Sequence, residues 1–221
     1  MSNQRLFDLY KRHESAIYSV GGRCAGHLEG PFLTAPHDAY WLCPIKVAFV
    51  GQQTKGWYSE NEIAKQMDGY SDFHLGKTYY SSPFWNVIRK LENALAGVNY
   101  SSAWLNFNRY DQDAARPSPE NERILSEIDF IVLEELKIIS ANVVVFLTGP
   151  GFYDRINILL QASPVAIKSF PLRQICELES PVLGGLIFRT YHPNYLRRSR
   201  LEPTVVDAIG DRVERKRLKH V

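Results

Sequence analysis

The stretch Leu186-Ile-Phe-Arg-Thr-Tyr-His192-Pro193-Asn-Tyr-Leu196-Arg197-Arg198-Ser-Arg200 decides how the fold is interpreted. An apolar and β-branched run ends abruptly at a His-Pro pair, and three arginines follow shortly afterwards. Apolar runs of this kind are typical of strands buried on both faces of a parallel sheet. The stretch therefore predicts a core strand at 186–191 that leads into a basic loop.

Three further apolar runs have the same form and end in polar or glycine-containing turns. They span 45–50, 103–108 and 142–147, and a weaker run at 165–170 indicates an edge strand. Strands that alternate with helices form parallel sheets with right-handed crossovers. We therefore expect an α/β fold, a three-layer α/β/α sandwich with a central four-stranded parallel sheet.

Apolar residues recur at helical spacing in the segments around these strands. The expected helices span 4–19, 59–68, 83–97, 119–139, 152–160 and 203–218, and 21–44 is expected to be a long loop. Ser59 and Glu62 form a capping-box pattern at the start of the second helix. No linker or repeat divides the chain, so a single domain is expected over 1–221. It comprises an N-terminal helix and loop (1–44), a core (45–201) and a basic C-terminal helix (203–221).

Composition narrows the class of protein. The chain has 221 residues, of which 45% are hydrophobic, enough to bury a full core. It has no apolar run of membrane-spanning length and no signal-peptide pattern, so we expect a cytoplasmic protein without membrane contacts. Cys24, Cys43 and Cys176 are odd in number and form no CxxC pair, which indicates neither disulfides nor a zinc site. We expect a monomer that uses no metal and no cofactor.

Ligands of parallel sheets bind beyond the carboxyl ends of the strands. The loops that meet there are 51–57, 106–113, 148–152 and 192–200. Asn106 ends an apolar strand, and a buried amide needs a partner, which a ligand can supply. The arginines around 197–200 are of the kind that bind phosphates. These loops are therefore the predicted site.

The motifs in these loops resemble those of the uracil-DNA glycosylase superfamily. The matching segments follow in the same order over about 42–201: Gly51-Gln-Gln-Thr, Pro83-Phe84, Asn106, Arg116-Pro-Ser-Pro-Glu-Asn-Glu, Asn142-Val-Val-Val-Phe-Leu and Thr190-Tyr-His192-Pro193-Asn-Tyr-Leu196-Arg197. The pattern is most similar to the iron–sulfur class of bacterial and archaeal enzymes. The His-Pro segment is the most specific motif and the first is the least.

This resemblance implies that the protein flips a damaged base out of DNA and hydrolyses its N-glycosidic bond. Phe84 would stack on the flipped base, and Asn106 would bind its Watson–Crick edge; Asn108 is the alternative if the strand register slips by two residues. His192 would stabilise the negative charge on the leaving base. Leu196 would fill the gap left in the duplex, and Arg197, Arg198 and Arg200 would contact DNA phosphates.

The chain departs from the family at the catalytic groups. Gln52 and Gln53 stand where a carboxylate or an asparagine is usual, and an amide is not a base at neutral pH, although it can hold a water. We expect Gln53, with Gln52, to position the attacking water. Candidates for additional chemistry lie in the 57–82 insertion, at Asp68, Asp72 and His74. Three cysteines cannot supply the four thiolates of a cluster, so no iron–sulfur cluster is expected.

Three functional hypotheses remain open from the sequence. The leading one is a DNA glycosylase that acts on uracil or another damaged base. The second is a catalytically inactive member that binds nucleic acid, and the third is a hydrolase of free nucleosides or nucleotides. Fold alone does not choose among them.

Overall fold

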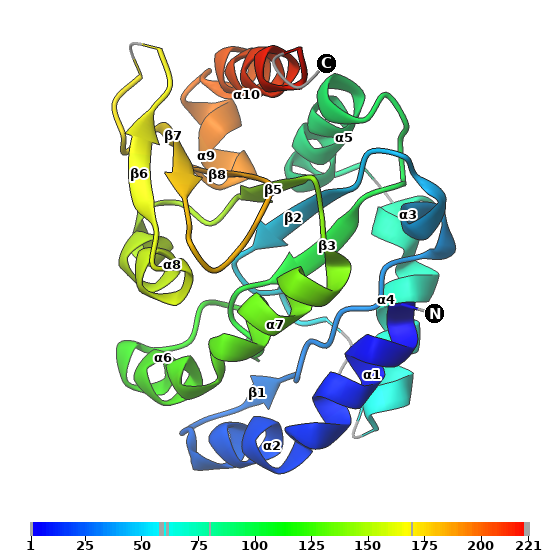
Figure 1. Cartoon of the computed structure of the whole chain (residues 1–221). Coiled ribbons are helices and arrows are strands. Elements are labelled where there is room, and N and C mark those ends of the chain that lie inside the picture. Colours follow the sequence, from blue (N-terminus) through cyan, green and yellow to red (C-terminus); the bar gives the residue numbers. More distant parts are fainter. Residues whose placement is uncertain (1, 58–59, 61, 80, 169, 219–221) are drawn as a thin grey trace.

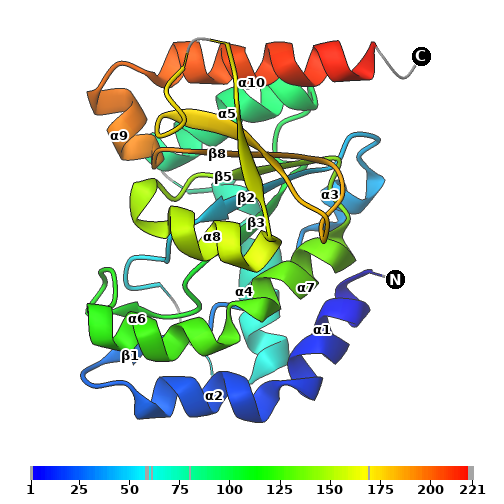
Figure 2. The ribbon, with the colours of Figure 1, turned by 60° about the vertical axis from the view of Figure 1, so that its left-hand side comes forward.

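The sheet at the centre of the molecule is mixed and is flanked by helices on both faces (Figures 1 and 2). The structure, a computed structural model, describes residues 2–57, 60, 62–79, 81–168 and 170–218. Its six strands have the order β3-β2-β5-β8-β7-β6. They span β2 (Val47–Gly51), β3 (Ala103–Asn106), β5 (Val143–Phe146), β6 (Ser163–Ala166), β7 (Ile175–Glu179) and β8 (Leu186–Thr190), while β1 (Leu28–Glu29) and β4 (Asp111–Gln112) form a separate antiparallel pair.

Helices surround this sheet and account for most of the remaining chain. They span α1 (Ser2–Arg12), α2 (Glu14–Arg23), α3 (Asp38–Leu42), α4 (Ile63–Phe73), α5 (Pro83–Leu95), α6 (Pro119–Leu125), α7 (Phe130–Ile139), α8 (Tyr153–Leu160), α9 (Pro193–Arg198) and α10 (Glu202–Arg217). Short 3-10 turns lie at His74–Gly76, Ser126–Ile128 and Pro150–Phe152. Within the described residues, no helix has the length and apolar content that crossing a membrane requires.

The four expected core strands are present and parallel, but the sheet has two further strands that were not part of the expected four-stranded parallel sheet. β3, β2, β5 and β8 pair in parallel, whereas β7 and β6 extend the sheet in antiparallel orientation. β7 was not expected because Glu177 interrupts its apolar pattern. That carboxylate is 3% exposed and pairs with Arg212 at 2.6 Å and Lys216 at 3.1 Å, both on α10. The positive charges of α10, which is distant in sequence, therefore compensate the buried carboxylate of Glu177 and allow this segment to form a strand.

Alternate residues of the parallel strands enter two separate cores. Val47 and Phe49 face the side covered by α5, α9 and α10, whereas Ala48 and Val50 face the side of α7 and α8. Figure 2 shows α5 and α10 above the sheet, with α7 and α8 below it. This alternation explains why each strand is apolar throughout.

Several expected elements differ in their bounds. The helix expected at 4–19 is two helices separated at His13, and the one at 119–139 is divided by the turn at 126–128. The loop expected at 21–44 contains β1 and α3, and the loop after His192 contains α9. The helix expected at 59–68 spans 63–73, and its proposed cap Ser59 lies outside the described residues, as do residue 169 of the expected edge strand and 219–221 of the last helix.

Candidate functional site

The register of β2 and β3 places Gly51 beside Asn106 at the carboxyl end of the sheet. A Cβ on Gly51 would lie 3.1 Å from Asn106 Oδ1 and 3.4 Å from Phe84 Cζ. Both side chains therefore pack against the Gly51 backbone so closely that a larger residue at this position would push them away. The two expected base-binding residues lie together at this point.

Phe84 lies at the start of α5, where Pro83 is the first residue and the Ser82 side chain accepts a hydrogen bond from Trp85 N at 3.3 Å. Its ring is partly exposed and packs against both cores. The ring centroid lies 5.7 Å from that of His192, with 33° between the planes. Phe84 thus links the Gly51–Asn106 pair to the His-Pro segment.

Asn106 is 1% exposed, and its Nδ2 donates to Tyr70 Oη at 2.8 Å. Tyr70 comes from α4, inside the insertion. Asn108, the alternative base-binding residue, is engaged elsewhere: its Nδ2 donates to Glu122 at 2.9 Å and its Oδ1 accepts from Arg155 at 2.9 Å. The geometry therefore brings Asn106, and not Asn108, beside Phe84.

His192 is held as a neutral donor. Its Nδ1 accepts a hydrogen bond from Asn194 N at 3.3 Å, which caps α9 and leaves the proton of the neutral ring on Nε2. Burial, and to a lesser extent the charge on Arg198, lowers the pKa of His192 to about 4. At neutral pH this side chain therefore offers an N–H donor without a positive charge.

An open pocket of about 680 Å³, here called the His192 pocket, lies beside this ring. Its lining includes Gln52, Thr148, Arg173, His192, Tyr195 and Arg198. Gln52 Nε2 donates to Thr148 O at 2.6 Å, which fixes the Gln52 amide at the pocket wall. Phe84 contacts His192 at the edge of this pocket, and neither Phe84 nor Asn106 is part of its lining.

The two glutamines differ in position. Gln52 lines the His192 pocket, whereas Gln53 is not part of its lining. Gln53 Oε1 is buried and has no hydrogen-bond partner among the residues that the structure describes. The geometry therefore makes Gln52 the better placed of the two to hold a water.

Leu196, the residue expected to fill the gap in the duplex, is not at the surface. This residue is 1% exposed and packs in the core cluster that α5 and α10 share. Because 193–198 is helical, Leu196 points toward the sheet while Tyr195, which is 45% exposed, points outward. Arg197, Arg198 and Arg200 are exposed as expected, and Arg197 Nε lies 3.5 Å from Glu202.

The insertion does not bring its titratable candidates to the His192 pocket. Asp68 and Asp72 line a different open pocket of about 490 Å³ with Trp57. His74 stacks on His37 with ring centroids 3.5 Å apart. What the insertion does contribute is Tyr70, whose position no local sequence pattern indicated.

The described residues contain no group of three or more His, Cys, Asp or Glu side chains that could hold a metal ion. The three cysteines are free thiols on separate segments. Absence of a cofactor therefore stays a prediction from the sequence.

No protein-family model matches the chain, and no curated protein matches it in sequence. The resemblance to uracil-DNA glycosylases consequently stays a prediction from the sequence motifs.

Replacement of Leu196 tests its position in the core. We expect Leu196→Ala to lower the free energy of unfolding by about 2–4 kcal/mol, because it removes a buried side chain and leaves a cavity. Tyr195→Ala, at the exposed neighbouring position, should change it by less than about 1 kcal/mol. Denaturant unfolding of both variants measures this difference, and a Leu196→Ala protein as stable as the wild type would contradict the buried position.

The pKa of His192 predicts a pH dependence of stability. Between its usual pKa of 6.5 and its folded pKa of about 4, the unfolded chain binds a proton that the folded chain does not. Acidification from about pH 7 to about pH 5 should therefore cost the wild type about 1 kcal/mol more than His192→Asn, a value reduced for the partial exposure of the ring. Denaturant unfolding at the two pH values checks this, and identical losses in both proteins would refute it.

Proposed function

We propose that the protein is a DNA glycosylase of the uracil-DNA glycosylase type, which hydrolyses the N-glycosidic bond of a base flipped from DNA. The observation that carries this proposal is that Phe84, Asn106 and a neutral His192, from three distant segments, lie at one edge of the sheet. This combination offers a stacking surface, an amide for a base edge and a donor for a leaving anion.

Each residue would act at a different part of the base. The base would stack on Phe84, and its polar edge would meet Asn106 once the Tyr70 hydroxyl and the Phe84 ring make room, since Asn106 is 1% exposed. His192 Nε2–H would donate to a base oxygen as the C1′–N bond breaks and its electron pair passes to the base. A neutral donor suits this step because it stabilises the anion without transferring its proton.

Water would complete the hydrolysis by adding to C1′. Gln52 lines the His192 pocket and could orient this water through its amide oxygen, because its Nε2 is bonded to Thr148 O. An amide does not accept the proton of the water, which would pass to solvent. The reaction then depends on charge stabilisation at the leaving base rather than on a general base.

A second candidate function, binding of nucleic acid without catalysis, is favoured by two observations. The loop after β2 carries Gln52 and Gln53 where a carboxylate would supply a base, and the Asn106 amide is occupied by Tyr70. Such a protein would bind a base or strand at the same edge and leave its glycosidic bond intact.

An excision assay separates the two candidates. A labelled oligonucleotide with one uracil, incubated with the protein and then with alkali, should be cleaved at the abasic site. His192→Ala should slow product formation by about 100–1,000-fold, the usual effect of removing one such donor. Gln52→Ala should slow it by about 100-fold through misplacement of the water.

Gln53→Ala serves as the matched control and should stay within about threefold of the wild type, because this neighbour does not line the pocket. A larger loss of excision rate in Gln53→Ala than in Gln52→Ala would indicate that Gln53, the residue expected from the sequence, positions the attacking water. No cleavage of uracil, hypoxanthine or mismatched substrates would contradict the glycosylase proposal and favour binding alone.

A further inference from the structure

The His192 pocket is larger than the proposed base site requires. Its volume is about 680 Å³, and it extends from His192 and Gln52 toward Arg173, which precedes β7. A base stacked on Phe84 would lie beside this space and leave much of it open. The pocket therefore has room for a second chemical group next to the flipped base.

Two guanidinium groups from different segments of the chain line the pocket. Arg198 lies on α9, and Arg173 lies in the connection from β6 to β7. Among the described residues neither is paired with a carboxylate, in contrast to Arg155, whose Nη2 lies 2.7 Å from Asp129. Arginines without a protein counter-ion at a pocket wall favour an anionic ligand, and phosphate is the common one.

Side chains from two neighbouring elements hold the backbone at Arg173 in place. Tyr153 Oη donates to Arg173 O at 3.0 Å, and Thr190 Oγ1 donates to the next carbonyl, Gln174 O, at 2.7 Å. These bonds hold the connection against β8, whose end leads directly to His192. The antiparallel extension of the sheet therefore contributes a cation to the same site.

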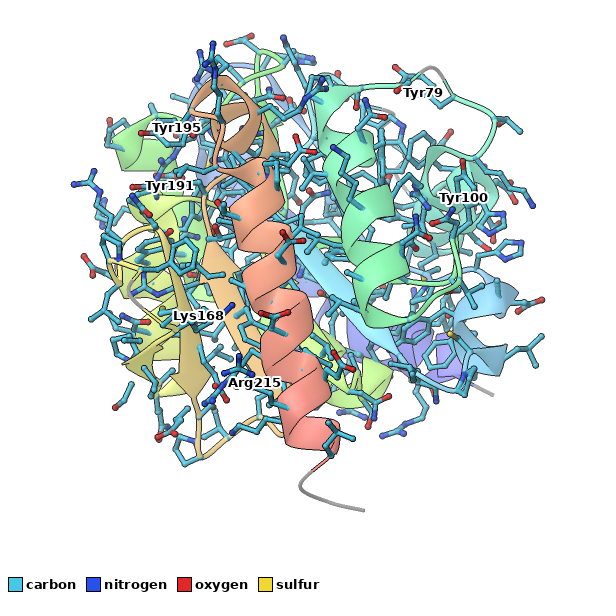
Figure 3. All side chains as sticks on the ribbon, turned by 90° about the horizontal axis from the view of Figure 1, so that it is seen from above. Tyr79, Tyr100, Lys168, Tyr191, Tyr195 and Arg215 are labelled. Carbon is cyan, nitrogen blue, oxygen red and sulfur yellow. The ribbon has the colours of Figure 1, made fainter. Side chains whose placement is uncertain are left out.

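Two aromatic side chains, Tyr191 and Tyr195, also line the His192 pocket. Tyr191 and Tyr195 have ring centroids 4.4 Å apart, and Tyr195 is 45% exposed. Figure 3 shows both side chains beside helices α9 and α10, on the other side of the molecule from the exposed Tyr79. Exposed aromatic rings beside basic residues are the usual platform for bases of single-stranded nucleic acids.

Thr148 gives an independent indication of a ligand. It is 1% exposed and lines the pocket, and its hydroxyl has no hydrogen-bond partner in the described part of the chain. A buried polar group without a partner is costly, and a bound acceptor such as a phosphate oxygen would satisfy it. The two arginines and this hydroxyl thus favour the same chemistry.

We propose that the His192 pocket binds an unpaired nucleotide adjacent to the flipped one, with its phosphate at Arg173 and Arg198 and its base on Tyr195. A base on Tyr195 cannot remain paired in a duplex. The substrate class is therefore a single-stranded nucleic acid, and DNA is expected from the proposed function. The position next to a flipped base rests on the proposed function, whereas binding of the unpaired nucleotide does not.

Binding of an undamaged strand tests the pocket without any excision. A fluorescein-labelled 12-nucleotide single strand, and the same strand annealed to its complement, are titrated with protein and followed by anisotropy. Wild type should bind the single strand more tightly. Tyr195→Ala and Arg173→Ala should each weaken this binding about tenfold, the scale of one stacked base or one charge-assisted contact.

Matched controls come from the same types of residue outside the pocket. Tyr79→Ala removes a tyrosine that is 51% exposed, and Lys168→Ala removes a cation on the same connection, paired with Asp211 at 2.5 Å. Both should stay within about twofold of the wild type. In addition, Arg173→Ala should reduce the slope of log affinity against log salt by about 0.7, as expected for one lost phosphate contact on a single strand.

Two outcomes overturn this inference. If Tyr195→Ala and Arg173→Ala both bind the single strand as tightly as the wild type, the pocket is not the binding site. If the wild type binds the single strand and the duplex equally tightly, the preference for an unpaired nucleotide is excluded. A protein that passes these binding tests but excises no base would therefore refute the proposed function and retain the nucleotide pocket.

Discussion

The close packing of Gly51 against Asn106 and Phe84 is the constraint on which the rest of the site depends. It follows from the register of β2 and β3, which continues past the strands through the bonds from Phe107 N to Gly51 O at 2.9 Å and from Asn108 N to Gln52 O at 2.8 Å. Since Gly51 has no Cβ, a ring and an amide can lie directly on its backbone. Phe84 then meets His192, and the first and last loops of the parallel sheet share one edge.

The parallel centre of the fold could be predicted from sequence because its strands are buried on both faces and therefore apolar throughout. The antiparallel extension could not. β7 carries Glu177, whose burial depends on Arg212 and Lys216 of α10, and no local pattern reports such distant partners. The division of the first helix at His13 and the helical form of 193–198 were missed for a related reason, because packing rather than apolar spacing decides where short helices begin and end.

Much of the candidate site followed from strand ends and motifs, and its remaining details depend on side-chain direction. Phe84 lies beside Asn106 at Gly51 and its ring lies 5.7 Å from that of His192, while their joint action on a base stays a prediction. Leu196 is buried and its neighbour Tyr195 is exposed because successive residues of a helix point in different directions. In the same way, Gln52 faces the pocket and Gln53 does not. Tyr70 and Arg173 reach the site from segments without a recognisable motif, so only the folded chain reveals them.

The central claim is that Phe84, Asn106 and His192 act on one flipped base. A crystal structure of the protein with a single-stranded oligonucleotide that carries a hydrolysis-resistant 2′-fluoro uridine analogue tests it most directly. The account predicts the uracil ring stacked on Phe84, its polar edge at Asn106 with Tyr70 displaced, and a base oxygen about 3 Å from His192 Nε2. A strand bound while Asn106 keeps its hydrogen bond to Tyr70 and Phe84 stays free of the base would contradict it.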